Sequence, residues 1–171
     1  MVRMSYNGYC SNYTLNRTEL INKHREQRTV YEKQARKIIT EWKEKYYPNE
    51  QLNITFTENE WDKTDFYINS KSKCELKIRW IKTIDKYEIY KKDGFVLSQK
   101  KLDNNDYFFY YIPITKELLY ITKTQIQNGL DNGYITTTEK EVNQYQFATE
   151  LGKKKELLLV IPYDCWKVYK M

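Results

Sequence analysis

The chain has 171 residues, of which 40% are hydrophobic and 16% aromatic, a length and composition that exclude disorder for its bulk. Its net charge of +6 and pI of about 9.0 suit a nucleic-acid partner, although charge by itself does not identify one. No apolar run approaches the roughly 18 residues of a membrane span, so we expect no membrane partner.

The cysteine pattern predicts reduced thiols. Cys10, Cys74 and Cys165 lie far apart, and the N-terminal sequence shows no apolar signal region. An odd number of widely spaced cysteines without such a region is typical of a soluble cytoplasmic protein. The Lys-, Asn-, Ile- and Tyr-rich composition is associated with AT-rich genomes, so the expected location includes the host cytoplasm of a phage-encoded protein.

The N-terminal third predicts an arm followed by helix. Residues 1–16 are weakly patterned and read as an arm, and residues 18–28 predict a short helix with few apolar anchors. Thr29 and Glu32 have the spacing of a capping box, so we expect a second helix to begin there and to end before Pro48. Its apolar stripe contains Tyr31, Ala35, Ile38, Ile39, Trp42 and Tyr46.

Three short alternating segments follow, at residues 52–56, 66–68 and 74–80. Alternation is typical of half-buried strands, and the short turns between them predict an antiparallel meander. Residues 81–105 are harder to interpret. Residues 91–94, KKDG, indicate a turn, and residues 95–103 are either a short helix or an irregular crossover.

The rest of the chain predicts more sheet. Residues 107–114 form a nearly continuous apolar run, which suits a strand covered on both faces, and residues 118–121 pair with it or follow on. KTQIQNGLDNG predicts a short helix ended by Gly129, and residues 156–163 predict a last central strand. We therefore expect a single α/β domain over residues 1–171, with a C-terminal strand extension over residues 126–171.

The parity of two strands places charged residues together. Phe66 and Ile68 are even-numbered and apolar, as are Cys74, Leu76, Ile78 and Trp80. A shared apolar face fixes the register, so Asp65, Glu75, Lys77 and Arg79 belong on the other face. If the turn is centred near Lys71, Asp65 lies opposite Lys77 and diagonally from Glu75.

These residue types suit metal-assisted phosphate chemistry. Mg²⁺ takes oxygen ligands, usually one or two carboxylates with water and substrate phosphate. Asp65 and Glu75 are therefore candidate metal ligands, Lys77 a candidate to position water, and Arg79 a candidate phosphate contact. The plainer alternative stays open, because opposite charges on an exposed strand face also stabilise an ordinary sheet modestly.

Asp65, nine residues and then Glu75-Leu76-Lys77 resemble the PD-(D/E)XK nuclease superfamily, which includes restriction endonucleases, Holliday-junction resolvases and some homing endonucleases. The resemblance covers roughly residues 29–125 and implies a restriction-endonuclease-like mixed sheet with an N-terminal helix packed on an antiparallel meander. Thr64 stands where the family motif has proline, and many members also have another residue at that position. Residues 95–103 are the best candidate for the helix between the motifs.

The resemblance implies a Mg²⁺-dependent endonuclease acting on DNA, with Mn²⁺ as a substitute metal. Asp65 and Glu75 would bind the metal and Lys77 would be the catalytic lysine. Glu32 matches the helical acidic residue that holds a metal-bound water in many members, and this role competes with the capping box. Many members dimerise, so a homodimer stays open.

Other charged positions are less specific. Lys91-Lys92, Lys100-Lys101 and residues 153–155 are basic clusters that are either solvated turns or DNA-backbone contacts. His24 is the only histidine, which excludes a histidine-rich zinc site or an HNH-type nuclease within this chain. Two further functions stay open on the same fold: a non-catalytic nucleic-acid-binding module, and a phage-type protein that binds a host protein.

Overall fold

The computed structural model describes residues 17–49, 52–58, 64–146 and 149–171, so the predicted N-terminal arm and Cys10 lie outside the described residues. The elements, in chain order, are α1 (Arg17–Tyr46), β1 (Ile54–Phe56), β2 (Phe66–Ile68), β3 (Ser72–Ile78), α2 (Ile84–Asp93), β4 (Phe95–Ser98), α3 (Gln99–Asn104), β5 (Tyr107–Ile112), β6 (Glu117–Thr122), α4 (Lys123–Asp131), β7 (Thr136–Gln146), β8 (Thr149–Ile161), the 3-10 helix η1 (Tyr163–Cys165) and β9 (Lys167–Lys170).

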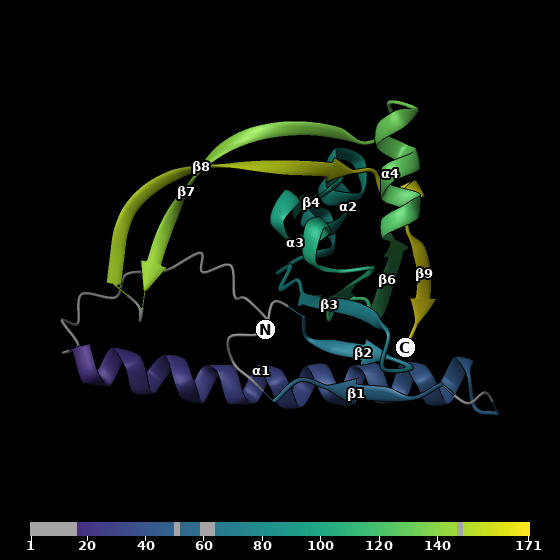
Figure 1. Cartoon of the computed structure of the whole chain (residues 1–171), viewed down its shortest axis with the longest axis horizontal. Helices are drawn as coiled ribbons and strands as arrows, with labels where there is room; N and C mark the ends of the chain where they lie inside the picture. The colour runs from purple at the N-terminus through teal and green to yellow at the C-terminus, as the bar shows by residue number, and fades with distance from the viewer. Residues whose placement is uncertain (1–16, 50–51, 59–63, 147–148) are drawn as a thin grey trace.

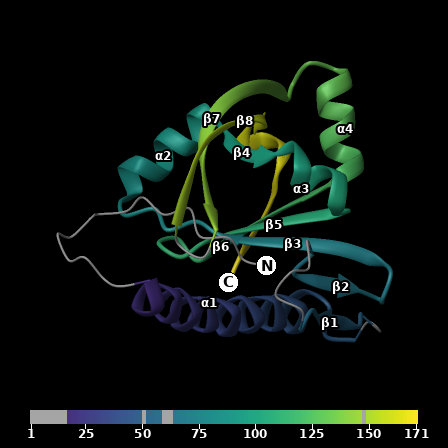
Figure 2. The ribbon, with the colours of Figure 1, turned by 60° about the vertical axis from the view of Figure 1, so that its left-hand side comes forward.

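The main sheet has six strands in the order β1-β2-β3-β5-β6-β9. Strands β1 to β3 form an antiparallel meander, β3 and β5 are parallel, and the remaining pairs are antiparallel. Helix α1 runs along the meander (Figures 1 and 2). The predicted fold class, an α/β chain with a mixed sheet and an N-terminal helix packed on an antiparallel meander, is confirmed.

The apolar stripe of α1 packs onto this sheet as predicted. Ile39 is fully buried and Trp42 is only 3% exposed, with its ring centroid 5.1 Å from that of Phe109 on β5. The even-numbered residues Leu76 and Ile78 of β3 belong to the same buried cluster. Complete burial of one large apolar side chain stabilises a fold by about 1.5–3 kcal/mol, so this face holds the helix in place.

Helix α1 begins at Arg17 and not at Thr29, so the predicted boundary and capping box are wrong. Thr29 lies within the helix, where its hydroxyl donates to the carbonyl of Arg25 at 3.0 Å. The segment 17–46 contains no proline or glycine that would interrupt a helix. A Thr-x-x-Glu spacing inside such a segment therefore has no helix end to cap.

Residues 81–105 contain two helices and a strand. The turn predicted at residues 91–94 is therefore wrong for its first three residues: Lys91, Lys92 and Asp93 form the last turn of α2. Gly94 ends the helix as its C-cap residue, with φ 93°. Thr83 caps α2 by accepting a hydrogen bond from the amide of Lys86, a signal that the sequence reasoning missed. The segment 95–103 divides into strand β4 and most of helix α3.

A second sheet, in the order β4-β8-β7, covers the other face of the main sheet. The predicted strand at residues 156–163 forms part of β8, so it belongs to this second sheet and not to the main one. Its residues Leu159 and Ile161 are fully buried in a cluster with Tyr110 of β5. Strands β7 and β8 extend beyond this cluster as a long curved hairpin (Figure 1).

Helix α4 continues through Gly129 to Asp131, so Gly129 does not end it. Gly129 is buried, and a Cβ atom there would lie 2.5 Å from the Cδ1 atom of Ile135. The residue is therefore a packing site between α4 and the segment that follows it. No helix among the described residues is long and apolar enough to cross a membrane.

Gly129→Ala is expected to destabilise the protein even though alanine favours a helix. The new methyl group overlaps Ile135, and overpacking typically costs about 1–3 kcal/mol, more than the gain of about 1 kcal/mol in helix propensity. Urea unfolding measures the change, with Gln127→Ala on the exposed part of α4 as the control. A Gly129→Ala protein more stable than wild type would contradict the close contact.

Candidate functional site

The hairpin of β2 and β3 has a different register from the predicted one. Phe66 pairs with Cys74 and Ile68 with Ser72, which centres the loop on Ser70 instead of Lys71. The predicted pairing of Asp65 with Lys77 is therefore wrong. Extending this register by one residue before Phe66 places Asp65 opposite Glu75.

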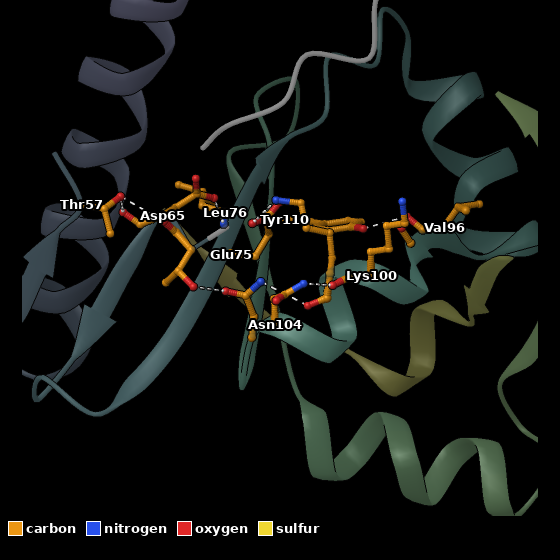
Figure 3. Close-up of polar contacts among 12 residues, drawn as sticks. Thr57, Asp65, Glu75, Leu76, Val96, Lys100, Asn104 and Tyr110 are labelled. Carbon is orange, nitrogen blue, oxygen red and sulfur yellow. Dashed lines mark hydrogen bonds and ion pairs between the residues drawn. The ribbon is translucent and has the colours of Figure 1, made fainter. Parts of the chain in front are cut away.

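Asp65 directly precedes the first residue of β2, and its carboxylate accepts a backbone hydrogen bond from the neighbouring strand. Its Oδ2 atom accepts a hydrogen bond of 2.8 Å from the amide of Leu76 on β3. Its carbonyl accepts hydrogen bonds from Thr57, through the amide at 3.1 Å and through the hydroxyl at 3.1 Å. Backbone and side chain are thus both held, so the carboxylate has a defined position beside β3 (Figure 3).

Glu32 lies on α1 and shares a small pocket with Asp65, Arg36 and Leu76. Its Oε1 atom is 2.9 Å from the Nε atom of Arg28, one helical turn away, and its side chain is 41% exposed. Because α1 extends well beyond it in both directions, Glu32 does not cap a helix. The structure therefore brings the predicted Glu32 and Asp65 together at one pocket.

Glu75 lies on the other side of β3, towards Tyr110 and Val96 (Figure 3). It is only 4% exposed, and the Nζ atom of Lys101 lies 2.6 Å and 2.7 Å from its two carboxylate oxygens. Burial raises the pKa of Glu75, and the charge of Lys101 opposes that increase. Lys101, predicted as a DNA contact, is thus the ion-pair partner of a candidate metal ligand.

Two buried polar residues connect the segment just before β2 to the C-terminal end of α3, the helix that carries Lys101. The Thr64 hydroxyl donates to the Asn105 side-chain oxygen at 3.0 Å, and the Asn105 amide donates to the Lys101 carbonyl at 3.2 Å. Thr64 and Asn105 are 4% and 1% exposed. This link was missed because it joins residues 41 positions apart without a motif.

Lys77 shares the face of Glu75 on β3. Its pKa is lowered from 10.5 to about 7, mainly by burial and also by the neighbouring charge of Arg79, while Glu75 opposes the change. Glu156 of β8 is a second acidic neighbour that favours the charged form. A lysine with this pKa exchanges its proton near neutral pH, which is a property of groups that act as acids or bases.

Arg79 is held inside the molecule. Its Nη2 atom donates to the Val96 carbonyl at 2.8 Å, and its guanidinium carbon lies 4.9 Å from the centre of the Tyr110 ring. Tyr110 donates to the same carbonyl at 2.7 Å. Arg79 therefore joins the main sheet to β4.

The other predicted DNA contacts lie on two separate helices. Lys91 pairs with Glu88 at 3.1 Å and lies over the ring of Tyr87 in the last turn of α2, next to the exposed Lys92. Lys100 is exposed on α3, one residue before Lys101. Among the lysines predicted to bind DNA, Lys101 is the one that forms an ion pair with a predicted catalytic residue within the described part of the chain.

The candidate metal ligands supply suitable atoms but no three-residue cluster. Asp65 and Glu75 provide carboxylate oxygens, and Mg²⁺ commonly takes only one or two carboxylates together with water and substrate. Within the ranges that the structure describes, no three Asp, Glu, His or Cys side chains are grouped so that they could hold a metal ion. The donor set thus fits Mg²⁺ in chemistry, with Lys101 next to one ligand.

No protein-family model and no curated protein matches the sequence. A similar solved structure is that of D212, a nuclease from a fusselovirus, with a TM-score of 0.45 and 18% identity. The match covers 91% of this chain and 90% of that chain. At this level the likeness assigns no activity.

Removing the charge of Lys101 is expected to destabilise the protein by about 3 kcal/mol, because it leaves the carboxylate of Glu75 buried without this ion pair. Urea unfolding of Lys101→Met measures the loss. Lys100→Met is the matched control, an exposed lysine on the same helix. The double change Lys101→Met with Glu75→Leu should cost less than the two single changes added together, and additive losses would contradict the pairing.

Lys77→Met is expected to stabilise the protein at pH 6 and to stabilise it less as the pH rises. The folded pKa of Lys77, about 7, is below its unfolded value, so between pH 7 and 10.5 only the unfolded chain keeps this proton. Wild-type stability therefore gains up to about 1.4 kcal/mol per pH unit in this window, and the variant lacks that gain.

Urea unfolding at pH 6 and pH 9 tests this dependence. Lys73→Met, an exposed lysine on the same strand, is the control and should show the same difference from wild type at both values. If the free energy of unfolding of Lys77→Met also differs from that of wild type by the same amount at both pH values, the pKa of Lys77 is not lowered in the folded protein.

Proposed function

We propose that the chain is a Mg²⁺-dependent endonuclease that hydrolyses DNA phosphodiester bonds, with a PD-(D/E)XK-like site. The observation that carries the proposal is the arrangement around Leu76. Its amide binds the carboxylate of Asp65, and the next residues on either side are Glu75 and Lys77. Glu75 and Lys77, whose pKa is lowered, thus share one face of β3, and the carboxylate of Asp65 binds the same strand from the neighbouring segment.

Asp65 and Glu75 would hold the metal, and Glu32, which shares the pocket of Asp65, is placed to orient water there. When bound, the ion would lower the pKa of a coordinated water and stabilise the negative charge that develops on the phosphate. The protein positions Asp65 through the Leu76 amide and keeps Glu75 out of bulk solvent.

Lys77 provides proton transfer in this proposal. With a pKa of about 7, its Nζ atom is neutral in a large fraction of molecules near neutral pH and can accept a proton from an attacking water. In its charged form the same atom stabilises an anionic phosphate. The exposed basic residues Lys92 and Lys100 would contribute general attraction to the DNA backbone.

A non-catalytic nucleic-acid-binding module on the same fold is the second candidate, and the Glu75–Lys101 ion pair favours it. Both carboxylate oxygens of Glu75 contact the ammonium group of Lys101, which occupies a position that a cation would need. Metal binding in the first candidate therefore requires Lys101 to move away from Glu75. In the second candidate the pair persists and the protein binds DNA without cleaving it.

Nicking of supercoiled plasmid in Mg²⁺ and in EDTA distinguishes the two candidates. We expect metal-dependent nicking that Glu75→Gln and Lys77→Met each reduce by about 10²-fold or more, the typical contribution of a positioned acid or base. Lys73→Met, at an exposed lysine on the same strand as Lys77, should nick at close to the wild-type rate, and unfolding curves verify that each variant is folded.

Two results would count against the endonuclease. Nicking that neither Glu75→Gln nor Lys77→Met reduces would place the activity elsewhere. Salt-dependent DNA binding without turnover in Mg²⁺ or Mn²⁺ would instead support the binding module.

A further inference from the structure

A second pocket lies beside the candidate site and is lined by aromatic and amide side chains. Its residues are Gln27, Val30, Tyr31, Gln34 and Trp80. The first four lie on α1 at a spacing of three to four residues, so they form one face of that helix. Trp80 comes from the segment after β3, directly after Arg79.

Trp80 presents an aromatic surface at this pocket. Its side chain is 54% exposed although Tyr31 packs against it edge to face, with ring centroids 5.9 Å apart and planes at 72°. Val30 on the same helical face is 64% exposed. A tryptophan that is held by an edge-to-face contact and is more than half exposed has ring surface available for a further flat group.

We infer that this pocket, the Trp80 pocket, binds an unpaired nucleobase of the DNA substrate. Bases stack on exposed aromatic rings in nucleic-acid-binding proteins, largely independently of base identity. The side-chain amides of Gln27 and Gln34 each carry donor and acceptor atoms that match the hydrogen-bonding edge of a base. The inference rests on the proposed function, because it assigns a place to a nucleotide of the same substrate.

The position of the Trp80 pocket on α1 supports this occupant. Tyr31 lines the Trp80 pocket and the next residue, Glu32, lines the pocket of Asp65. The same helix carries nine Lys or Arg residues and only five Glu residues, a balance that attracts a polyanion. A strand of DNA whose phosphate reached Asp65 would therefore have neighbouring nucleotides along α1.

The size of the pocket also favours a base over a second copy of the chain. Five residues line it, whereas a stable protein–protein interface engages roughly 20–30 residues from each partner. A single flat base needs only one aromatic ring and a few polar groups. The geometry thus points to a substrate that is at least locally single-stranded, such as an end, a flap or a branch.

Fluorescence anisotropy with a short, labelled, single-stranded oligothymidylate tests the inference. The measurement is made in EDTA, so it reports binding without cleavage. A loss of the base-binding inference is therefore distinguishable from a loss of the nuclease proposal. We expect Trp80→Ala to weaken binding about tenfold, within the range observed for loss of one base-stacking contact. Trp80→Tyr, which keeps a ring, should retain most of the affinity.

Two controls make the result specific. Tyr134→Ala removes an aromatic side chain that is 68% exposed after α4 and should leave the affinity unchanged. An oligonucleotide of abasic residues keeps the phosphates, so wild type and Trp80→Ala should bind it equally. Unfolding midpoints verify that both Trp80 variants fold.

Three results would overturn the inference. One is unchanged affinity of Trp80→Ala for oligothymidylate, and another is an equal loss for the abasic strand. The third is a change in molecular mass on size exclusion without a change in oligonucleotide affinity, which would assign the pocket to contact between copies of the chain.

Discussion

Strand β3 is covered on both faces although only one of its faces is apolar. Leu76 and Ile78 pack against α1, and the opposite face, with Glu75, Lys77 and Arg79, lies beneath β4, α3 and β8. Removing these three charges from water is costly unless each finds a partner. Much of the polar structure around β3 supplies those partners: Lys101 for Glu75, and the Val96 carbonyl with the Tyr110 ring for Arg79.

Burying these charged groups contributes little to the stability of the fold. A buried ion pair is often no more stabilising than apolar residues of the same volume, because desolvation cancels much of the attraction. Lys77 illustrates the cost, since its lowered pKa means that the fold disfavours its charged form. Perturbed titrating groups gathered near a pocket are typical of functional sites, which is why the proposed site is at β3 and not on the exposed lysines.

The sequence predicted the parts of this site that depend on local pattern. Alternation along β3 correctly assigned Glu75 and Lys77 to one face and Leu76 to the other, and the stripe on α1 correctly identified the helix that covers the apolar face. The predicted loop centre, Lys71, was one residue away from the observed centre, Ser70, because the register depends on the backbone conformation of Asn69 and Ser70. Both adopt left-handed conformations, with φ 52° and 57°, and neither is a glycine that would have indicated this.

The partners of the charged face were beyond prediction for a different reason. Lys101 lies 26 residues from Glu75, and Thr64 lies 41 residues from Asn105. Contacts at such separations depend on how the second sheet and α3 pack onto the first sheet, and no pattern in residues 81–105 specified that packing. Lys101 was recognised only as one of several basic residues, so its role as a partner of Glu75 came from the structure.

The two layers around β3 also restrict how a substrate can approach. The side of β3 that carries Glu75 is covered by Lys101 and β4, whereas Asp65 and Glu32 line a pocket beside α1 at the start of β2. A phosphate would therefore meet Asp65 first and would reach Glu75 only after α3 shifts or Lys101 changes rotamer. A surface lysine side chain can rearrange within nanoseconds, but Lys101 is 17% exposed and its backbone carbonyl is bound by Asn105. The Thr64–Asn105 link thus joins the residue that precedes Asp65 to the helix that carries Lys101, so the two carboxylates are connected through buried hydrogen bonds.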